Sequence, residues 1–160
     1  GKEIQKQNHK RQEEYRLKRK AQIDATFMHI AEDIASLSHC TRAKVGALIV
    51  ADKNILAYGY NGTPTGFDNI AEDEIDGKLV TKPETLHAES NAIAKIAKSH
   101  LSSEGSTMYV TLSPCFECSK LIIQSGIKRI VYKTEYRETS GIKFLQKCGV
   151  LVEKLNTTKS

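Results

Sequence analysis

Long apolar runs and cysteine are both scarce in this chain of 160 residues. No apolar run approaches the roughly 20 residues of a membrane span, and no signal-peptide pattern opens the chain, so we expect neither a membrane protein nor a secreted one. Two of the four cysteines form a Cys-x-x-Cys, and without secretory signals this favours metal or redox use over a disulfide framework. The sequence therefore predicts one compact domain in the reducing cytoplasm.

Excess charge is also missing, except at one end. The net charge is +5, and residues 1–20 hold eight basic and three acidic side chains, whereas the rest holds 16 of each. A basic arm can attract nucleic acid or nucleotide phosphates, and a solvated helix end is the alternative that we favour, because few large apolar residues occur there. We expect a basic N-terminal extension at 1–20, helical or disordered, one domain at 21–155, and a polar tail at 156–160.

Apolar spacing predicts the order of elements. A helical period begins at Ile23 and predicts an amphipathic helix over 23–38. Further helices are expected at 88–97, 114–126 and 141–147, and strands at 45–50, 55–60, 107–112, 128–133 and 150–153, with a loop at 67–86 that carries an acidic cluster. This order predicts an α/β fold, a three-layer α-β-α arrangement around a central mixed sheet of five strands.

The residues that carry chemistry lie in two short segments, Leu86-His87-Ala88-Glu89 and Ser113-Pro114-Cys115-Phe116-Glu117-Cys118. One histidine and two cysteines are three zinc ligands, which leave tetrahedral zinc one open position. A carboxylate beside that position can move protons to and from water. The spacing is the zinc deaminase signature H-x-E…P-C-x-x-C, so we predict hydrolytic deamination with Glu89 as the catalytic residue and His87, Cys115 and Cys118 on zinc.

Both segments are predicted to begin helices. Ser113 should cap the second helix, with Pro114 as its first residue, and Cys115 and Cys118 should share one helical face. A structural zinc site would need a fourth protein ligand, and no other cysteine or histidine occurs at a paired spacing. Half of a zinc ribbon and a redox pair are the alternatives for an isolated Cys-x-x-Cys.

Further stretches resemble the deoxycytidylate (dCMP) deaminase family, within the cytidine deaminase-like superfamily. They are C-T-R-A-K-V-G-A at 40–47, G-Y-N-G-T-P-T-G at 59–66, H-A-E-S-N-A-I at 87–93, T-L-S-P-C at 111–115 and S-G-I-K at 125–128. The resemblance covers about residues 23–153 and implies hydrolysis of dCMP to dUMP and ammonia, which supplies thymidylate synthesis. The zinc motif is common to the superfamily, whereas the segment around Asn61 distinguishes this family.

The resemblance also implies a substrate site. Asn61 would contact the substrate near the base and sugar. Gly59 and Gly62 would let the backbone approach a ligand, form a tight turn, or do both. Ser113 and the aromatic Tyr136 would lie on the substrate side. Candidates for the 5′-phosphate are Lys98, Arg137 and Arg42.

Regulation and assembly are implied in the same way. Family members of this type are homohexamers that dCTP with Mg²⁺ activates and dTTP inhibits, and the allosteric nucleotide would bind near Arg42, Asn61 and Gly62. Some members hold a second, structural zinc before the His-Ala-Glu motif, but residues 66–86 contain no histidine or cysteine. We therefore expect one zinc per chain and a loop held by packing of Phe67, Ile70, Ile75 and Leu79.

Two other functions stay open. A tRNA-adenosine or polynucleotide cytosine deaminase would use the same zinc chemistry, and the basic N-terminus favours it slightly. The neutral charge balance of the remaining chain argues against nucleic acid as a partner. The second alternative is a non-catalytic zinc module that senses nucleotides, which would bind without turnover.

Overall fold

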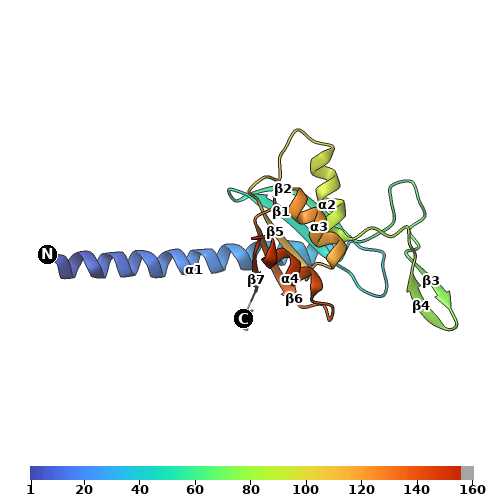
Figure 1. Cartoon of the computed structure of the whole chain (residues 1–160), viewed down its shortest axis with the longest axis horizontal. Coiled ribbons are helices and arrows are strands. Elements are labelled where there is room, and N and C mark those ends of the chain that lie inside the picture. The colour runs from blue at the N-terminus through green and yellow to red at the C-terminus, as the bar shows by residue number, and fades with distance from the viewer. Residues whose placement is uncertain (156–160) are drawn as a thin grey trace.

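A five-stranded mixed sheet forms the centre of the computed structural model, which describes residues 1–155 (Figure 1). The strand order is β2 (Asn54–Tyr60), β1 (Gly46–Ala51), β5 (Thr107–Leu112), β6 (Arg129–Thr134) and β7 (Leu151–Lys154). β1 pairs antiparallel with both β2 and β5, whereas β5, β6 and β7 run parallel. The predicted sheet and its strand positions are confirmed. The expected tail at 156–160 lies outside the described residues.

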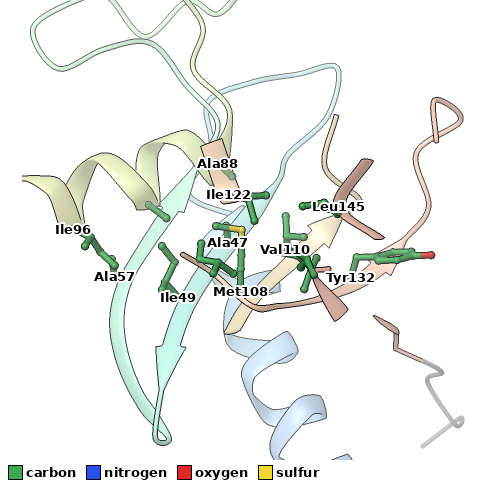
Figure 2. Close-up of a cluster of buried hydrophobic side chains, with 14 of the residues drawn as sticks. Ala47, Ile49, Ala57, Ala88, Ile96, Met108, Val110, Ile122, Tyr132 and Leu145 are labelled. Carbon is green, nitrogen blue, oxygen red and sulfur yellow. The ribbon is translucent and has the colours of Figure 1, made fainter. Parts of the chain in front are cut away.

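Helices cover both faces of this sheet. Along β1, Ala47 and Ile49 face one side, whereas Leu48 and Val50 face the other. The first side packs against α2 (Ala88–Ala97), α3 (Phe116–Gln124) and α4 (Ser140–Lys147), as Figure 2 shows for the buried core. The second side packs against α1 (Lys2–Ala35), which is the one helix on this face among residues 1–155, and against Leu155. The three-layer α-β-α prediction is confirmed.

The helix α1 is much longer than the periodicity predicts. It begins at Lys2, so residues 2–20 continue the helix that covers the sheet, and residues 1–19 are exposed and project away from the body (Figure 1). The helix ends at Ala35, three residues earlier than expected, and Leu37 lies in the following turn with half of its surface exposed. None of the helices in residues 1–155 has the length and apolar character that crossing a bilayer requires.

Buried charges hold α1 on the sheet. The carboxylate of Asp24 accepts hydrogen bonds from the guanidinium of Arg129 on β6, at 2.6 and 3.0 Å, and from the hydroxyl of Tyr109, at 2.7 Å. Arg129 also pairs with Glu153, which in turn binds Lys20 of α1. Burial raises the pKa of Asp24, but the hydrogen bonds from Arg129 and Tyr109 outweigh it and keep the pKa below its usual value.

The expected loop before α2 contains a β-hairpin, β3 (Glu72–Ile75) and β4 (Lys78–Thr81), which protrudes from the body (Figure 1). Its turn is Asp76-Gly77, with both residues at positive φ, the type of turn that Asp-Gly favours between strands. The expected apolar packing is wrong, because two strands alone expose both faces to solvent. At least half of the side-chain surface is exposed at each of Phe67, Ile70, Ile75 and Leu79.

Backbone pairing closes this segment at its base. Gly62 and Leu86 form an isolated antiparallel bridge, in which each N–H donates to the other's carbonyl, at 3.0 and 2.7 Å. Further along, the carbonyl of Ala71 accepts from the Lys82 N–H and the Thr85 hydroxyl. The hairpin is therefore joined to the body between β2 and α2 by two closely spaced strands of chain that are linked by hydrogen bonds.

Candidate metal and substrate site

The three predicted zinc ligands come together at two helix starts. His87 is the N-cap residue of α2 and Cys115 is that of α3, each with extended backbone, and Cys118 lies in the first turn of α3. The prediction that Ser113 caps α3 is wrong. Because Cys115 is still extended, the helix begins at Phe116, and the Cys115 sulfur itself accepts the Cys118 N–H at 3.4 Å.

Two glycines let the backbone pack closely around these helix starts. A Cβ at Gly59 of β2 would collide with the carbonyl oxygen of Ala88 and lie 2.6 Å from the nitrogen of Ala92, both in α2. A Cβ at Gly141 of α4 would collide with the carbonyl of Pro114 and lie 2.8 Å from that of Cys115. Gly59 thus accommodates a helix, not the ligand that we expected, whereas a Cβ at Gly62 would meet nothing within 4 Å and the φ of Gly62 is not positive.

The distances between the three ligands suit a metal ion. Nδ1 of His87 lies 3.2 Å from Sγ of Cys118 and 3.5 Å from Sγ of Cys115. Zinc–nitrogen bonds of about 2.0 Å and zinc–sulfur bonds of about 2.3 Å in a tetrahedron place nitrogen and sulfur about 3.5 Å apart. Within residues 1–155 this is the one group of three or more potential ligands that converges in this way. The residues present fit Zn²⁺ with one position left open.

Glu89 lies in the first turn of α2, two residues after His87, and is almost fully buried, with 4% of its surface exposed. Burial raises the pKa of Glu89 to about 7. Among the metal ligands, contacts with Cys118 and His87 lower the pKa of Cys115 to about 4, which favours its thiolate, whereas the contact with Cys115 and burial raise the pKa of Cys118. The site combines metal-binding groups with a carboxyl group that is shielded from solvent.

A cavity of about 250 Å³ opens onto these residues. Of the predicted substrate and regulatory residues, Asn61, Ser113, Tyr136 and Arg42 line it, and Gly62 directly follows Asn61. Lys98 does not line it, because Lys98 is the C-cap of α2, and nine residues of helix separate it from Glu89 by about 13 Å. Arg137 is also absent from the lining.

Hydrogen bonds already use part of the polar lining. The side-chain oxygen of Asn61 accepts the Val45 N–H at 2.8 Å, and its nitrogen donates to the Ala43 carbonyl at 2.8 Å, so this amide fastens the segment before β1 to the end of β2. The hydroxyl of Ser113 accepts the Tyr136 N–H at 2.7 Å and places Tyr136 beside the metal ligands. Both residues thus build the pocket wall.

Sequence reasoning missed one wall of this cavity. Glu72, Thr81 and Thr85 line it, and all three belong to the hairpin segment that was expected to be a loop. The Asp76-Gly77 pair is a sequence signal for the hairpin. No local pattern signals that the hairpin folds back towards residues 41–42, since that contact joins positions about 30 apart.

Buried carboxylate, histidine and paired cysteines at the starts of two helices, above a mixed sheet with helices on both faces, are the parts of a zinc-dependent hydrolytic deaminase. Comparison with known proteins gives the family. The model of the cytidine and deoxycytidylate deaminase zinc-binding region matches residues 21–134, and the chain belongs to this family.

Curated relatives and a solved structure agree with this membership. The chain is 38% identical over 133 residues to ComE operon protein 2 of Bacillus subtilis, covering 81% of this chain and 69% of that protein. It is 35% identical over 158 residues to human deoxycytidylate deaminase, covering 84% and 86%. The crystal structure of dCMP deaminase from the cyanophage S-TIM5 in complex with dCMP and dUMP is 50% identical, with a TM-score of 0.79, and covers 83% of this chain and 96% of that chain.

Proposed function

We propose that this protein hydrolyses dCMP to dUMP and ammonia. The observation that carries the proposal is the convergence of His87, Cys115, Cys118 and Glu89 at one end of a cavity whose other walls bear Asn61, Arg42 and Tyr136. Similarity to the cyanophage enzyme, which was crystallised with both dCMP and dUMP, supports the choice of substrate. The reaction consumes one water, breaks the bond from C4 to the exocyclic amine, and leaves a carbonyl at C4.

The proposed roles follow from chemistry and position. His87, Cys115 and Cys118 would hold Zn²⁺, which supplies a Lewis acid that makes water nucleophilic near neutral pH. Glu89 would carry both protons of the attacking water in turn: the first passes from the water to N3 of the cytosine, and the second passes from the hydroxyl formed at C4 to the departing amine as the C4 carbonyl forms. Its burial keeps bulk water from competing for these protons. Asn61, Ser113 and Tyr136 would shape the pocket for the base and sugar.

Phosphate recognition is proposed for Arg42, the cation of the three candidates that lines the cavity. We also propose that dCTP with Mg²⁺ activates the enzyme, that dTTP inhibits it, and that the chain forms a homohexamer. Similarity to deoxycytidylate deaminases supports the proposals on regulation and assembly. The four cysteines, all of which lie in the described residues, form no disulfide, which suits a reducing compartment such as the cytoplasm.

Ultraviolet absorbance on dCMP, CMP, dCTP and deoxycytidine, with and without dCTP plus Mg²⁺, tests the proposal. We expect dCMP to give the highest kcat/KM and deoxycytidine to be about tenfold to a hundredfold poorer, because the charge-assisted contact between Arg42 and the phosphate would be lost. Greater ammonia release from tRNA or single-stranded DNA than from dCMP would overturn the substrate assignment. Nucleotide binding without turnover would identify a sensor.

A further inference from the structure

The β3–β4 hairpin contacts the body of the protein through very few polar groups. In the described part of the chain, the hydrogen bonds from its strands to residues outside 62–86 all fall on Thr41 and Arg42. The acceptors of these bonds are Glu72 and Thr81, which are cross-strand partners in the hairpin. One pair of residues therefore determines how the hairpin meets the loop that precedes β1.

Glu72 makes the stronger half of this contact. One of its carboxylate oxygens accepts the backbone N–H of Thr41 at 2.7 Å, the N–H of Arg42 at 3.0 Å and the Thr41 hydroxyl at 3.3 Å. Burial raises the pKa of Glu72, but these hydrogen bonds outweigh it, and the side chain stays ionised. A carboxylate that receives two successive backbone N–H groups fixes the direction of that backbone, because the donors must converge on one atom.

Thr81 completes the contact by holding the side chain of Arg42. The Thr81 hydroxyl accepts from the guanidinium at 3.0 Å, so the hairpin orients both the backbone and the charged end of Arg42. Glu72, Thr81 and Arg42 all line the cavity beside the metal ligands. The hairpin thus positions the guanidinium of Arg42 at the wall of the pocket.

The same loop is fastened from its other side by Asn61. Its amide binds Ala43 and Val45, and its carbonyl accepts the Ser38 hydroxyl at 2.7 Å. Asn61 thus holds the loop on both sides of the Thr41 and Arg42 backbone that Glu72 binds, and the residues of this loop that line the cavity are Cys40, Arg42, Ala43 and Val45. Without the Glu72 contact, the backbone of Thr41 and Arg42 would lose its partner on the hairpin, and only the Thr81 hydroxyl would still link Arg42 to the hairpin.

We propose that Glu72 is a positioning residue that fixes the Arg42 wall of the pocket and thereby determines the affinity for the nucleotide substrate. The inference rests on the proposed function, because the substrate is taken to be dCMP. Glu72 touches no reacting atom in this scheme. Its contribution therefore belongs to KM, not to kcat, and to the substrate's phosphate, not to its base.

Steady-state kinetics on Glu72→Ala and Glu72→Gln test the proposal. Glu72→Ala is expected to raise KM for dCMP about tenfold, the size of one charge-assisted hydrogen bond, with kcat within about twofold of the original. Glu72→Gln keeps an acceptor oxygen without the charge and should raise KM about threefold. The matched control is Glu74→Gln, an exposed glutamate two residues along the same strand, which should leave both constants unchanged.

Amide hydrogen exchange tests the contact of Glu72 with Thr41 and Arg42 separately from the identity of the substrate. Exchange at Thr41 and Arg42 should accelerate in Glu72→Ala and not in Glu74→Gln, whatever the substrate proves to be. A wild-type protein inactive on dCMP would overturn the proposed function, while the exchange data would still decide the contact. Active wild type with an unchanged KM in Glu72→Ala, or unchanged exchange at Thr41 and Arg42, would overturn the role of Glu72 alone.

Discussion

The two walls of the pocket are built in opposite ways. On the metal side, helix starts pack backbone against backbone, with glycine at positions 59 and 141 because a side chain there would collide with main-chain atoms. On the hairpin side, apolar residues such as Ile75 face solvent, and a few hydrogen bonds from Glu72 and Thr81 make the connection. The metal ligands thus lie on the closely packed, rigid wall, while the hairpin wall depends on a few polar contacts.

The largest expected effect is at Glu89, on the rigid wall. Glu89→Gln should lower kcat on dCMP by about 10³-fold, because the amide cannot carry protons, with zinc content unchanged by metal analysis. Glu117→Gln is the matched control, an exposed glutamate in the first turn of α3, and should stay active. Substantial turnover by Glu89→Gln would remove Glu89 from the chemistry.

The next largest effect is expected where α1 meets the sheet behind the metal wall. Asp24→Asn should destabilise the protein by about 3 kcal/mol, because Arg129 loses a buried partner. Urea unfolding measures this, with the exposed Asp33→Asn on the same helix as control.

The pH dependence of the same pair has a defined sign. Because folding depresses the pKa of Asp24 below its ordinary 3.8, the stabilisation is complete above that value and is lost as pH falls through the folded-state pKa. The difference in stability between wild type and Asp24→Asn should therefore shrink on acidification below about pH 4. A constant difference down to pH 2 would contradict an ionised Asp24.

Glycine substitutions compare the rigid wall with its neighbouring turn. Gly59→Ala should cost about 2 kcal/mol and reduce zinc retention, because the added Cβ pushes α2 and His87 away from Cys115. Gly62→Ala, three residues later, meets nothing within 4 Å and should be neutral. Thermal unfolding and metal analysis of both variants decide the point, and equal effects would mean that close packing at 59 does not matter.

The smallest effect is expected on the hairpin wall. Ile75→Ser and Leu79→Ser should each change unfolding free energy by less than about 0.5 kcal/mol, because both side chains are already half exposed. Ile122→Ala in the buried core of α3 should cost about 3 kcal/mol by comparison. A large loss in the hairpin variants would restore the expectation that apolar packing holds this segment.

The same contrast explains what sequence could predict. Periodicity predicted the strands and the helix that His87 begins, and motif spacing predicted that Cys115 and Cys118 converge, since these features depend on local patterns. These patterns did not predict that Glu72 lines the pocket, because its hydrogen-bond partners lie about 30 residues away in the sequence. They also predicted the wrong cap for α3, where the Cys115 sulfur takes the place of the expected serine. Lys98 was predicted to bind the substrate, but it does not line the cavity, because the length of α2 separates it from Glu89.

The bridge between Gly62 and Leu86 makes residues 63–85 a self-contained insertion, a cassette that the corresponding segment of a related enzyme could replace. Its two ends are held together by their own backbone hydrogen bonds, so the polypeptide leaves and re-enters the domain at one place. Lengthening a loop whose ends are already joined adds little to the entropy cost of closing it. Shortening the loop would leave the position of His87 at the start of α2 unchanged. Chimaeras that exchange this cassette between related enzymes should keep their zinc and differ in nucleotide preference, which gives protein engineering a route to specificity that does not disturb the chemistry.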